Sequence, residues 1–203
     1  MTISAETTAS DGRPRCPWST GAPELTSYHD AEWGFPVDQD QRLFEKLCLE
    51  SFQSGLSWRT ILNKREAFRA GFAGFEIAAV ARFGEEDVRR LLADAGIVRN
   101  RAKIEACINN AQRAEELIAQ EGSLASFLWR FEPSAEELAE PQTLTVSPAS
   151  GALAKELKRR GWKFFGPTTA FAFMQSMGML NDHVHDCILR EPVERARADF
   201  HRP

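Results

Sequence analysis

Apolar residues recur every three to four positions in several segments of the chain, which is the spacing of one face of an α-helix. The first such segment begins near Asp38, where Asp38 and Gln41 have the spacing of a capping box. The segment after Pro167 is apolar almost all round, so we expect it to be a buried central helix. Helices are predicted from about residue 38, over 85–94, from about 100 to 118, over 149–160 and over 167–177.

The composition also favours helices over strands. The 203-residue chain has 27 Ala and 17 Leu but only 15 Val and Ile together, which is too few β-branched residues for a large sheet. We therefore predict an all-α fold. One domain is expected over residues 15–190, with a disordered tail at 1–14, a C-terminal tail at 191–203 and a surface loop within 132–150.

The chain lacks the features of a membrane or secreted protein. No apolar run approaches the roughly 18 residues that a membrane-spanning helix needs. The first residues are polar and have neither the basic start nor the apolar stretch of a secretory signal. These features predict a cytoplasmic protein with no membrane partner.

The charge of the chain is uneven. The net charge is −4, which argues mildly against nucleic-acid binding as a whole. Basic residues nevertheless cluster at 59–69, 99–103 and 155–163. Taken alone, clusters of this kind are usually solvated faces.

One basic cluster lies where the predicted helices at 85–94 and 100–118 meet in a hairpin. Free backbone N–H groups at such a turn can bind a phosphate, so Gly96, Arg99 and Arg101 are candidate DNA contacts. An ordinary hairpin of two helices is the commoner structure. Only the first Gly of the usual Gly-apolar-Gly turn of DNA-binding hairpins is present.

Cysteine and histidine residues near the two ends of the chain suggest a metal site. His183 and Cys187 are four residues apart and would share a helix face, and Cys16 and His29 come early in the chain. Two Cys and two His would make a closed, structural zinc site. The alternative is four unrelated residues, because positions 29 and 183 are 154 residues apart. A disulfide is disfavoured in the cytoplasm. His185 is a competing ligand, whereas Cys48 and Cys107 lie among apolar residues and are expected in the core.

A carboxylate in an aromatic setting is the candidate functional group. Glu50 borders the apolar face of the first predicted helix and is expected to be half-buried. Such an arrangement suits a flat, cationic or amine-bearing ligand, because rings stack on its faces and the carboxylate accepts hydrogen bonds. The alternative is a surface Glu beside core aromatics. The aromatic residues near it in sequence are Trp18, Tyr28, Trp33 and Trp58.

Several motifs together resemble DNA-3-methyladenine glycosylase I, in the right order over about residues 16–190. They are Tyr-His-Asp-Ala-Glu-Trp-Gly at 28–34, Leu-Glu-Ser-Phe-Gln-Ser-Gly-Leu-Ser-Trp at 49–58 and Asn-Asp-His-Val at 181–184. Asp-Ala-Gly-Ile-Val-Arg at 94–99 and Lys-Phe-Phe-Gly-Pro-Thr-Thr at 163–169 match too. The resemblance implies a helix–hairpin–helix glycosylase fold.

The resemblance also implies roles for single residues. It implies one structural zinc per chain bound by Cys16, His29, His183 and Cys187, which ties the N- and C-terminal segments together. Glu50 and Trp58 would contact the excised base as catalytic and base-binding residues, and Tyr28, Trp18 and Trp33 would line the pocket. Two positions depart from the family. Leu25 replaces a common Tyr, and Ser-Phe-Gln follows Glu50 where a Gly and a second Gln are common.

The function implied is a base-excision repair enzyme that hydrolyses the N-glycosidic bond of 3-methyladenine. Its partners would be double-stranded alkylated DNA and the free base, and the protein would be a monomer. Glu50→Gln is then expected to leave the fold intact and to weaken binding of the base. The alternative is a zinc-stabilised DNA-binding module that senses alkylated bases without cutting. A zinc hydrolase is disfavoured, because four protein ligands leave no place for an activated water.

Overall fold

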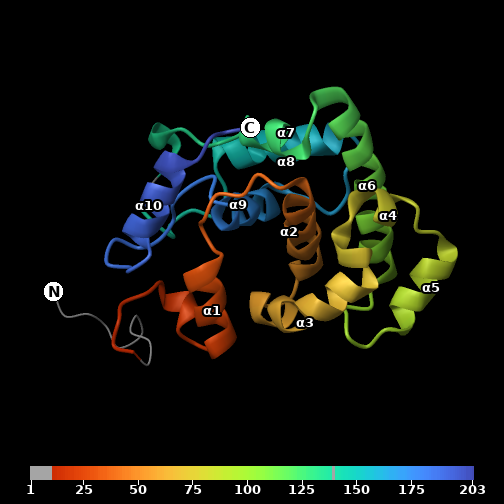
Figure 1. The fold of residues 1–203 in the computed structure, drawn as a ribbon, viewed down its shortest axis with the longest axis horizontal. Helices are drawn as coiled ribbons and strands as arrows, with labels where there is room; N and C mark the ends of the chain where they lie inside the picture. The colour runs from red at the N-terminus through yellow and green to blue at the C-terminus, as the bar shows by residue number, and fades with distance from the viewer. Residues whose placement is uncertain (1–10, 139) are drawn as a thin grey trace.

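The computed structural model describes residues 11–138 and 140–203. Every regular element in these residues is a helix, and the short helices η2, η3 and η4 are 3₁₀ (Figure 1). The elements are η2 (Pro17–Ser19), α1 (Pro23–Ala31), α2 (Asp40–Gln53), α3 (Trp58–Gly71), η3 (Ala73–Phe75), α4 (Ile77–Ala81), α5 (Glu85–Ala93), α6 (Arg101–Glu121), α7 (Leu124–Trp129), η4 (Ala135–Glu137), α8 (Pro148–Arg159), α9 (Pro167–Ser176) and α10 (Arg190–Asp199).

The five helices with regular apolar spacing form where the sequence predicts them, as α2, α5, α6, α8 and α9. The start of α2 differs from the prediction. Its N-cap is Gln39, with no side-chain cap, and Gln41 instead donates a hydrogen bond to the carbonyl of Gly74. The carboxylate of Asp40 accepts bonds from the backbone N–H groups of Leu124 and Ala125. Acidic residues at the start of α2 therefore join it to the N-terminus of α7 rather than cap their own helix.

Five further α-helices were not predicted, because each is short or lacks a clean apolar repeat. Two of them begin at serine caps. Ser57 accepts from the N–H of Thr60 at the start of α3, and Ser123 accepts from the N–H of Ser126 at the start of α7. Such caps satisfy backbone donors that the first helical turn leaves unpaired.

The two predicted tails are partly structured. Residues 1–10 lie outside the described part of the chain, but the carbonyl of Pro14 accepts a hydrogen bond from the N–H of Ile188. Residues 191–203 were expected to be a tail, yet most of them belong to α10 and Val193 is fully buried. Polar residues dominate α10, so its single buried apolar side chain gave little periodic signal. Within the described residues, no helix is long and apolar enough to cross a membrane.

The helices pack around α2 and α9, which lie at the centre of the molecule (Figure 1). Helix α8 packs along α9, and α4 packs along α6. A run of stacked phenylalanines fills the space between α2 and α3, with Phe52 4.7 Å from Phe68 and Phe72 5.5 Å from Phe75 between ring centroids. Gly178, at a φ of 73°, lets the chain beside Pro36 pass against the end of α9, since a Cβ there would lie 2.4 Å from the nitrogen of Pro36. This crossing sets the segment between α1 and α2 beside α9.

Candidate functional site

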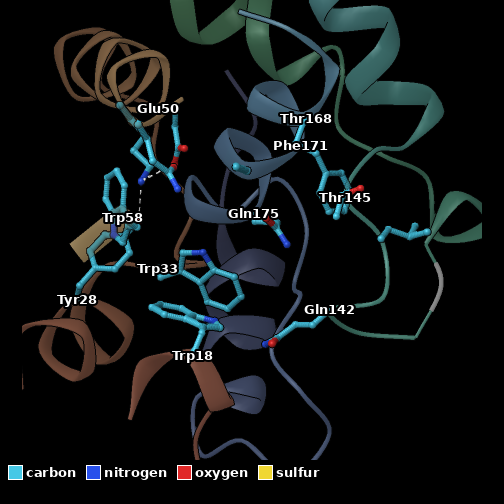
Figure 2. A pocket seen from close by; sticks show the side chains of 14 residues that line it. Trp18, Tyr28, Trp33, Glu50, Trp58, Gln142, Thr145, Thr168, Phe171 and Gln175 are labelled. Carbon is cyan, nitrogen blue, oxygen red and sulfur yellow. Dashed lines mark hydrogen bonds and ion pairs between the residues drawn. The ribbon is translucent and has the colours of Figure 1, made fainter. Parts of the chain in front are cut away.

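A pocket of about 390 Å³ lies where η2, α1, α2, α3 and α9 meet (Figure 2). The segment between η4 and α8 closes its far side. Most of its wall is apolar or aromatic, as in small-molecule sites that take flat ligands. The lining residues are Trp18, Tyr28, Trp33, Lys46, Glu50, Gln53, Trp58, Gln142, Leu144, Thr145, Thr168, Phe171, Ala172 and Gln175.

Four aromatic side chains form one wall of the pocket. Trp18 and Trp33 meet edge to face with their centroids 5.1 Å apart. Tyr28 and Trp58 lie 5.2 Å apart between centroids. Tyr28 and Trp33 are buried, with 4% and 7% of their surface exposed. The structure brings together the four aromatic residues that the sequence indicated, although they come from three separate segments, with Tyr28 and Trp33 in the same one.

Glu50 enters the pocket from α2 and is more buried than the sequence suggests. It is 6% exposed, and its Oε1 lies 2.8 Å from the Nζ of Lys46, one helical turn earlier. The same ammonium donates a hydrogen bond of 2.7 Å to the hydroxyl of Tyr28 and stands 3.4 Å from the ring centroid of Trp58 (Figure 2). Glu50 is therefore a member of a buried ion pair, and Lys46 is a pocket residue that the sequence analysis did not assign.

Burial sets the ionisation of the groups around Glu50. Desolvation lowers the pKa of Lys46, and the nearby charge of Glu50 opposes that effect. Desolvation, with a further contribution from Glu50, raises the pKa of Tyr28 well above its ordinary value. Tyr28 is therefore a neutral phenol that accepts a hydrogen bond from Lys46 and keeps its own O–H as a donor.

The opposite wall presents amide groups. The side-chain N–H of Gln175 donates to Oδ2 of Asp182 at 2.6 Å, and the backbone N–H of Gln142 donates to Oδ1 of the same residue at 2.9 Å. Because Asp182 takes the N–H end of the Gln175 amide, the carbonyl end is left as an acceptor at the pocket (Figure 2). Glu50 and Gln175 thus give the pocket two hydrogen-bond acceptors on different walls.

Beside the pocket, Cys16, His29, His183 and Cys187 form one buried cluster, and their ligand atoms all lie within 4.8 Å of one another. The Sγ of Cys187 lies 3.3 Å from Nδ1 of His183 and 3.4 Å from Nε2 of His29, and the Sγ of Cys16 lies 3.5 Å from Nδ1 of His183. A tetrahedral ion with ordinary zinc–sulfur and zinc–nitrogen bonds would set sulfur and nitrogen about 3.5 Å apart. The cluster therefore fits a four-coordinate metal.

The other ring nitrogens of the two histidines are held by neighbours, as metal-binding histidines require. Nδ1 of His29 lies 2.8 Å from Oδ1 of Asp30, and Nε2 of His183 lies 3.2 Å from the carbonyl of Trp33. These contacts leave the opposite nitrogens facing the two cysteines. His185, the competing ligand, is exposed and lies 2.8 Å from a carboxylate oxygen of Glu140 instead.

The two cysteines of the cluster interact directly. Interaction between the two sulfurs lowers the pKa of Cys187 and raises that of Cys16, so one of the two thiols loses its proton more easily than the other. A bound metal would favour the thiolate form of both.

The predicted hairpin joins α5 and α6, and its turn packs on α3. Gly96 is required there, because a Cβ would lie 2.8 Å from the Cβ of Ala67. The N–H of Gly96 donates to Oδ1 of Asp94 at 2.7 Å, and Lys64 donates to the Gly96 carbonyl. This backbone N–H is therefore already used inside the protein.

The two predicted arginines of the hairpin differ in their surroundings. Arg101 is paired with Glu85 and Glu105 at 3.1 Å each. Arg99 is exposed and has no ion-pair partner among residues 11–138 and 140–203. Lys103, counted in the same basic cluster, is 9% exposed and donates to the carbonyls of Phe52 and Ser54. It caps the C-terminus of α2 rather than facing solvent.

The sequence of the chain is similar to those of known proteins. A family model for methyladenine glycosylase matches residues 18–191, which include the whole aromatic wall and the metal cluster apart from Cys16. The chain belongs to the methyladenine glycosylase family.

Within the methyladenine glycosylase family, similarity extends over nearly the whole length of each relative. The chain is 45% identical over 177 residues to DNA-3-methyladenine glycosylase 1 of Escherichia coli (strain K12), which covers 85% of this chain and 95% of that protein. A structure of a 3-methyladenine DNA glycosylase I variant in complex with 3-methyladenine superposes with a TM-score of 0.79 at 36% identity, covering 85% and 95% of the two chains. The Staphylococcus aureus enzyme, solved to explain 3-methyladenine recognition, gives a TM-score of 0.81 at 37% identity, covering 85% and 94%. The all-α fold predicted from the sequence is confirmed for the described residues, and it matches the fold of a solved 3-methyladenine DNA glycosylase I.

Leu25 is one of the two positions at which the sequence departs from the motifs of the methyladenine glycosylase family. It is half-buried on α1 and does not line the pocket. The segment expected as a surface loop at 132–150 supplies part of the pocket wall.

Several pocket residues were not assigned from the sequence. Among them, Lys46 could have been found from its spacing, because it lies one turn before Glu50 on the same helix. The pocket residues that sequence reasoning did not assign are Lys46, Gln53, Gln142, Leu144, Thr145, Thr168, Phe171, Ala172 and Gln175.

Proposed function

We propose that this protein excises 3-methyladenine from alkylated double-stranded DNA by hydrolysing the bond between the base and the deoxyribose. The observation that carries the proposal is a buried carboxylate, Glu50, in an aromatic pocket of about 390 Å³ within a member of the methyladenine glycosylase family. In a duplex the target base is stacked and paired, so a pocket inside the protein cannot surround it. The target nucleotide must therefore leave the duplex before it can bind.

The chemistry of the lesion reduces what the protein must supply. Methylation at N3 gives the attached adenine a positive charge, so the base is already a good leaving group. Water adds its oxygen to C1′, the C1′–N9 bond breaks, and its electron pair neutralises the ring as the base departs. The proton lost by the water passes to solvent. A strong general base is not required, and we assign none.

The pocket residues of this chain hold and orient the base. Glu50 accepts a hydrogen bond from the exocyclic amine, and Gln175 offers a second acceptor from the opposite wall. Tyr28 and Trp58 supply ring surface, and the phenol of Tyr28 supplies a donor. Aromatic stacking and desolvated hydrogen bonds fix the position of the base relative to the attacking water. Trp18 and Trp33 complete the wall.

We also propose that the metal bound by Cys16, His29, His183 and Cys187 is one structural zinc per chain. Zinc would contribute folding free energy, because four protein ligands complete its coordination. It takes no part in the hydrolysis. The cluster lies directly behind Trp33, whose ring centroid is 4.7 Å from that of His183, so the metal fixes the aromatic wall from behind.

DNA binding is assigned to the hairpin between α5 and α6, with Arg99 as its free cation. The protein would act in the cytoplasm. It would act as a monomer, since one chain contains the whole pocket and the whole metal cluster. Contacts with phosphates position the duplex without reading its sequence, and the base pocket selects the lesion.

Release of the free base from methylated duplex DNA tests this function. The purified protein should liberate 3-methyladenine, detected by chromatography of the ethanol-soluble fraction. Ala172→Phe would fill the pocket from α9, so base release should fall at least tenfold while duplex binding persists. Ala152→Phe makes the same change at an exposed position of α8 and should release the base normally. DNA binding without base release by the wild type would leave a non-catalytic sensor of alkylated bases as the function.

A further inference from the structure

Lys46 is a lysine whose ammonium points into the molecule rather than into solvent. It is 5% exposed and lines the same pocket as Glu50 and Trp58 (Figure 2). Lysines on helices ordinarily extend their charge into water, and fully buried ones need partners. The partners of Lys46 are therefore informative about the pocket.

The ammonium of Lys46 engages the three groups best suited to bind a cation. It lies 2.8 Å from Oε1 of Glu50, donates to the hydroxyl of Tyr28 at 2.7 Å, and stands 3.4 Å from the centroid of Trp58. A carboxylate, a phenol oxygen and an indole face are also what a positively charged base would use. An internal cation thus already occupies a cation-binding site in the pocket wall.

Both carboxylates on the far side of Lys46, Glu32 and Glu45, are already paired with arginines, and Arg42 adds a further positive charge at the same cleft. Arg65 and Glu32 form a two-pronged pair with distances of 2.7 and 2.8 Å. Arg69 and Glu45 form another at 2.8 Å. These groups line a small cleft behind Lys46 and leave no unpaired carboxylate there to take over its charge. Within the base pocket itself, Lys46 and Glu50 are the charged residues, and their charges cancel.

We propose that Lys46 is a specificity-determining residue that sets the charge selectivity of the base pocket. Its ammonium is a built-in counter-ion of Glu50, so the pocket favours a cationic base over a neutral one less strongly than Glu50 alone would. The proposal rests on the proposed function, because it assumes that the pocket receives the base. Its consequence is that the positive charge of the base contributes little to its affinity, so that shape and hydrogen bonds select the lesion. Removing the lysine charge turns the pocket into a cation-selective site.

Two small probes measure this selectivity without any base excision. One is 3,9-dimethyladeninium, whose charge is fixed at neutral pH, and the other is neutral 9-methyladenine. Each is titrated calorimetrically into the wild type, Lys46→Met and Lys46→Arg. Because the methyl that distinguishes the probes is the same in every titration, its effect cancels when the affinity ratios of variants are compared. Arg42→Met is the control for charge outside the base pocket, since it removes one positive charge from an exposed position of α2 that lines the cleft behind Lys46.

Lys46→Met should raise the ratio of cation to neutral affinity by about 10- to 100-fold, the range of one charged hydrogen bond. Lys46→Arg keeps the charge and should leave the ratio within about threefold of the wild type, as should Arg42→Met. An unchanged ratio in Lys46→Met, or an equal loss of both affinities, would overturn the proposal and leave Lys46 as a packing residue. Lys46→Gln replaces Lys46→Met if the latter does not fold, judged by circular dichroism.

These titrations separate the proposal from the proposed function. Base release by the wild type is measured in a different assay, and an unchanged probe ratio beside normal base release would refute only the role of Lys46. Failure of the wild type to bind either probe would refute the base pocket, and the role of Lys46 with it.

Discussion

Replacing Glu50 by Gln is expected to destabilise the protein substantially, because it leaves the ammonium of Lys46 buried without a counter-charge. The pair is closed at 2.8 Å, and both residues are about nineteen-twentieths buried. Removing one partner of a buried ion pair costs about 3–5 kcal/mol. The amide of Gln keeps one acceptor for Lys46 but no charge.

The stability lost in Glu50→Gln has an upper bound, because Lys46 can give up its proton and become neutral when its counter-charge is removed. Keeping a lysine of ordinary pKa neutral at pH 7 costs about 1.4 kcal/mol for each of roughly 3.4 pH units, or about 4.6 kcal/mol. For a chain of about 200 residues, each kcal/mol lowers the melting temperature by about 2–4 °C. Glu50→Gln should therefore melt roughly 6–18 °C below the wild type at pH 7.

The loss should shrink as the pH rises. In the variant, burial lowers the pKa of Lys46 below its unfolded value, and the main opposing charge, that of Glu50, is gone. Between those two pKa values the unfolded chain binds one more proton than the folded chain, so stability increases with pH by up to about 1.4 kcal/mol per unit. The double variant Lys46→Met/Glu50→Gln removes both charges and should recover most of the stability and lose this slope.

Thermal unfolding followed by circular dichroism between pH 7 and 9 measures the melting temperatures of the wild type, Glu50→Gln and the double variant, and how each changes with pH. Glu66→Gln is the control, because it makes the same chemical change in an exposed ion pair with Arg69 and should shift stability by no more than about 1 kcal/mol. Equal melting temperatures for Glu50→Gln and Glu66→Gln would refute the reasoning. So would a loss in Glu50→Gln that is the same at pH 7 and pH 9.

Two further predictions concern the metal and the hairpin. Cys16→Ser should lower zinc content, measured by mass spectrometry of the purified protein, together with the melting temperature; full zinc occupancy in the Cys16→Ser/His183→Ala double variant would contradict the ligand assignment. Arg99→Ala should weaken binding to any duplex and reduce the slope of log affinity against log salt by about one. Arg101→Ala should do less, because Glu85 and Glu105 already offset that charge, and equal slopes for wild type and Arg99→Ala would exclude this phosphate contact.

The sequence predicted well the features that depend on local pattern or on motifs. Asn100 was identified as the start of a helix, and its side chain does accept a hydrogen bond from the N–H of Lys103. Residue type and spacing suggested the aromatic group and the four-residue cluster, family resemblance strengthened both suggestions, and the structure brings the members of each group together. No local rule joins residues that lie more than 150 positions apart.

The errors share one physical cause, which is that side chains found partners far away in the sequence. The expectation that Glu50→Gln leaves the fold intact did not take into account the buried pairing with Lys46, which is the basis of the revised prediction above. Lys103 was counted as surface charge, whereas carbonyls at the end of α2 draw it inward. Gln142 and Gln175 could not be assigned, because their place in the pocket depends on Asp182 lying between them. Charge and polarity alone do not reveal whether a group faces water.

The metal cluster has a topological consequence. Cys16 and His183 are 167 positions apart, so a metal bound to both turns most of the chain into a closed ring. Closing so long a loop removes freedom of the unfolded chain worth about 5 kcal/mol at 25 °C. Trp18 and Tyr28 lie between the first two ligands, and Trp33 follows them, so a chelator would open the ring at the segment that carries the aromatic wall. Removal of the metal should therefore abolish base binding in the pocket while the phenylalanine core remains packed. The result would be an inactive protein that is still folded.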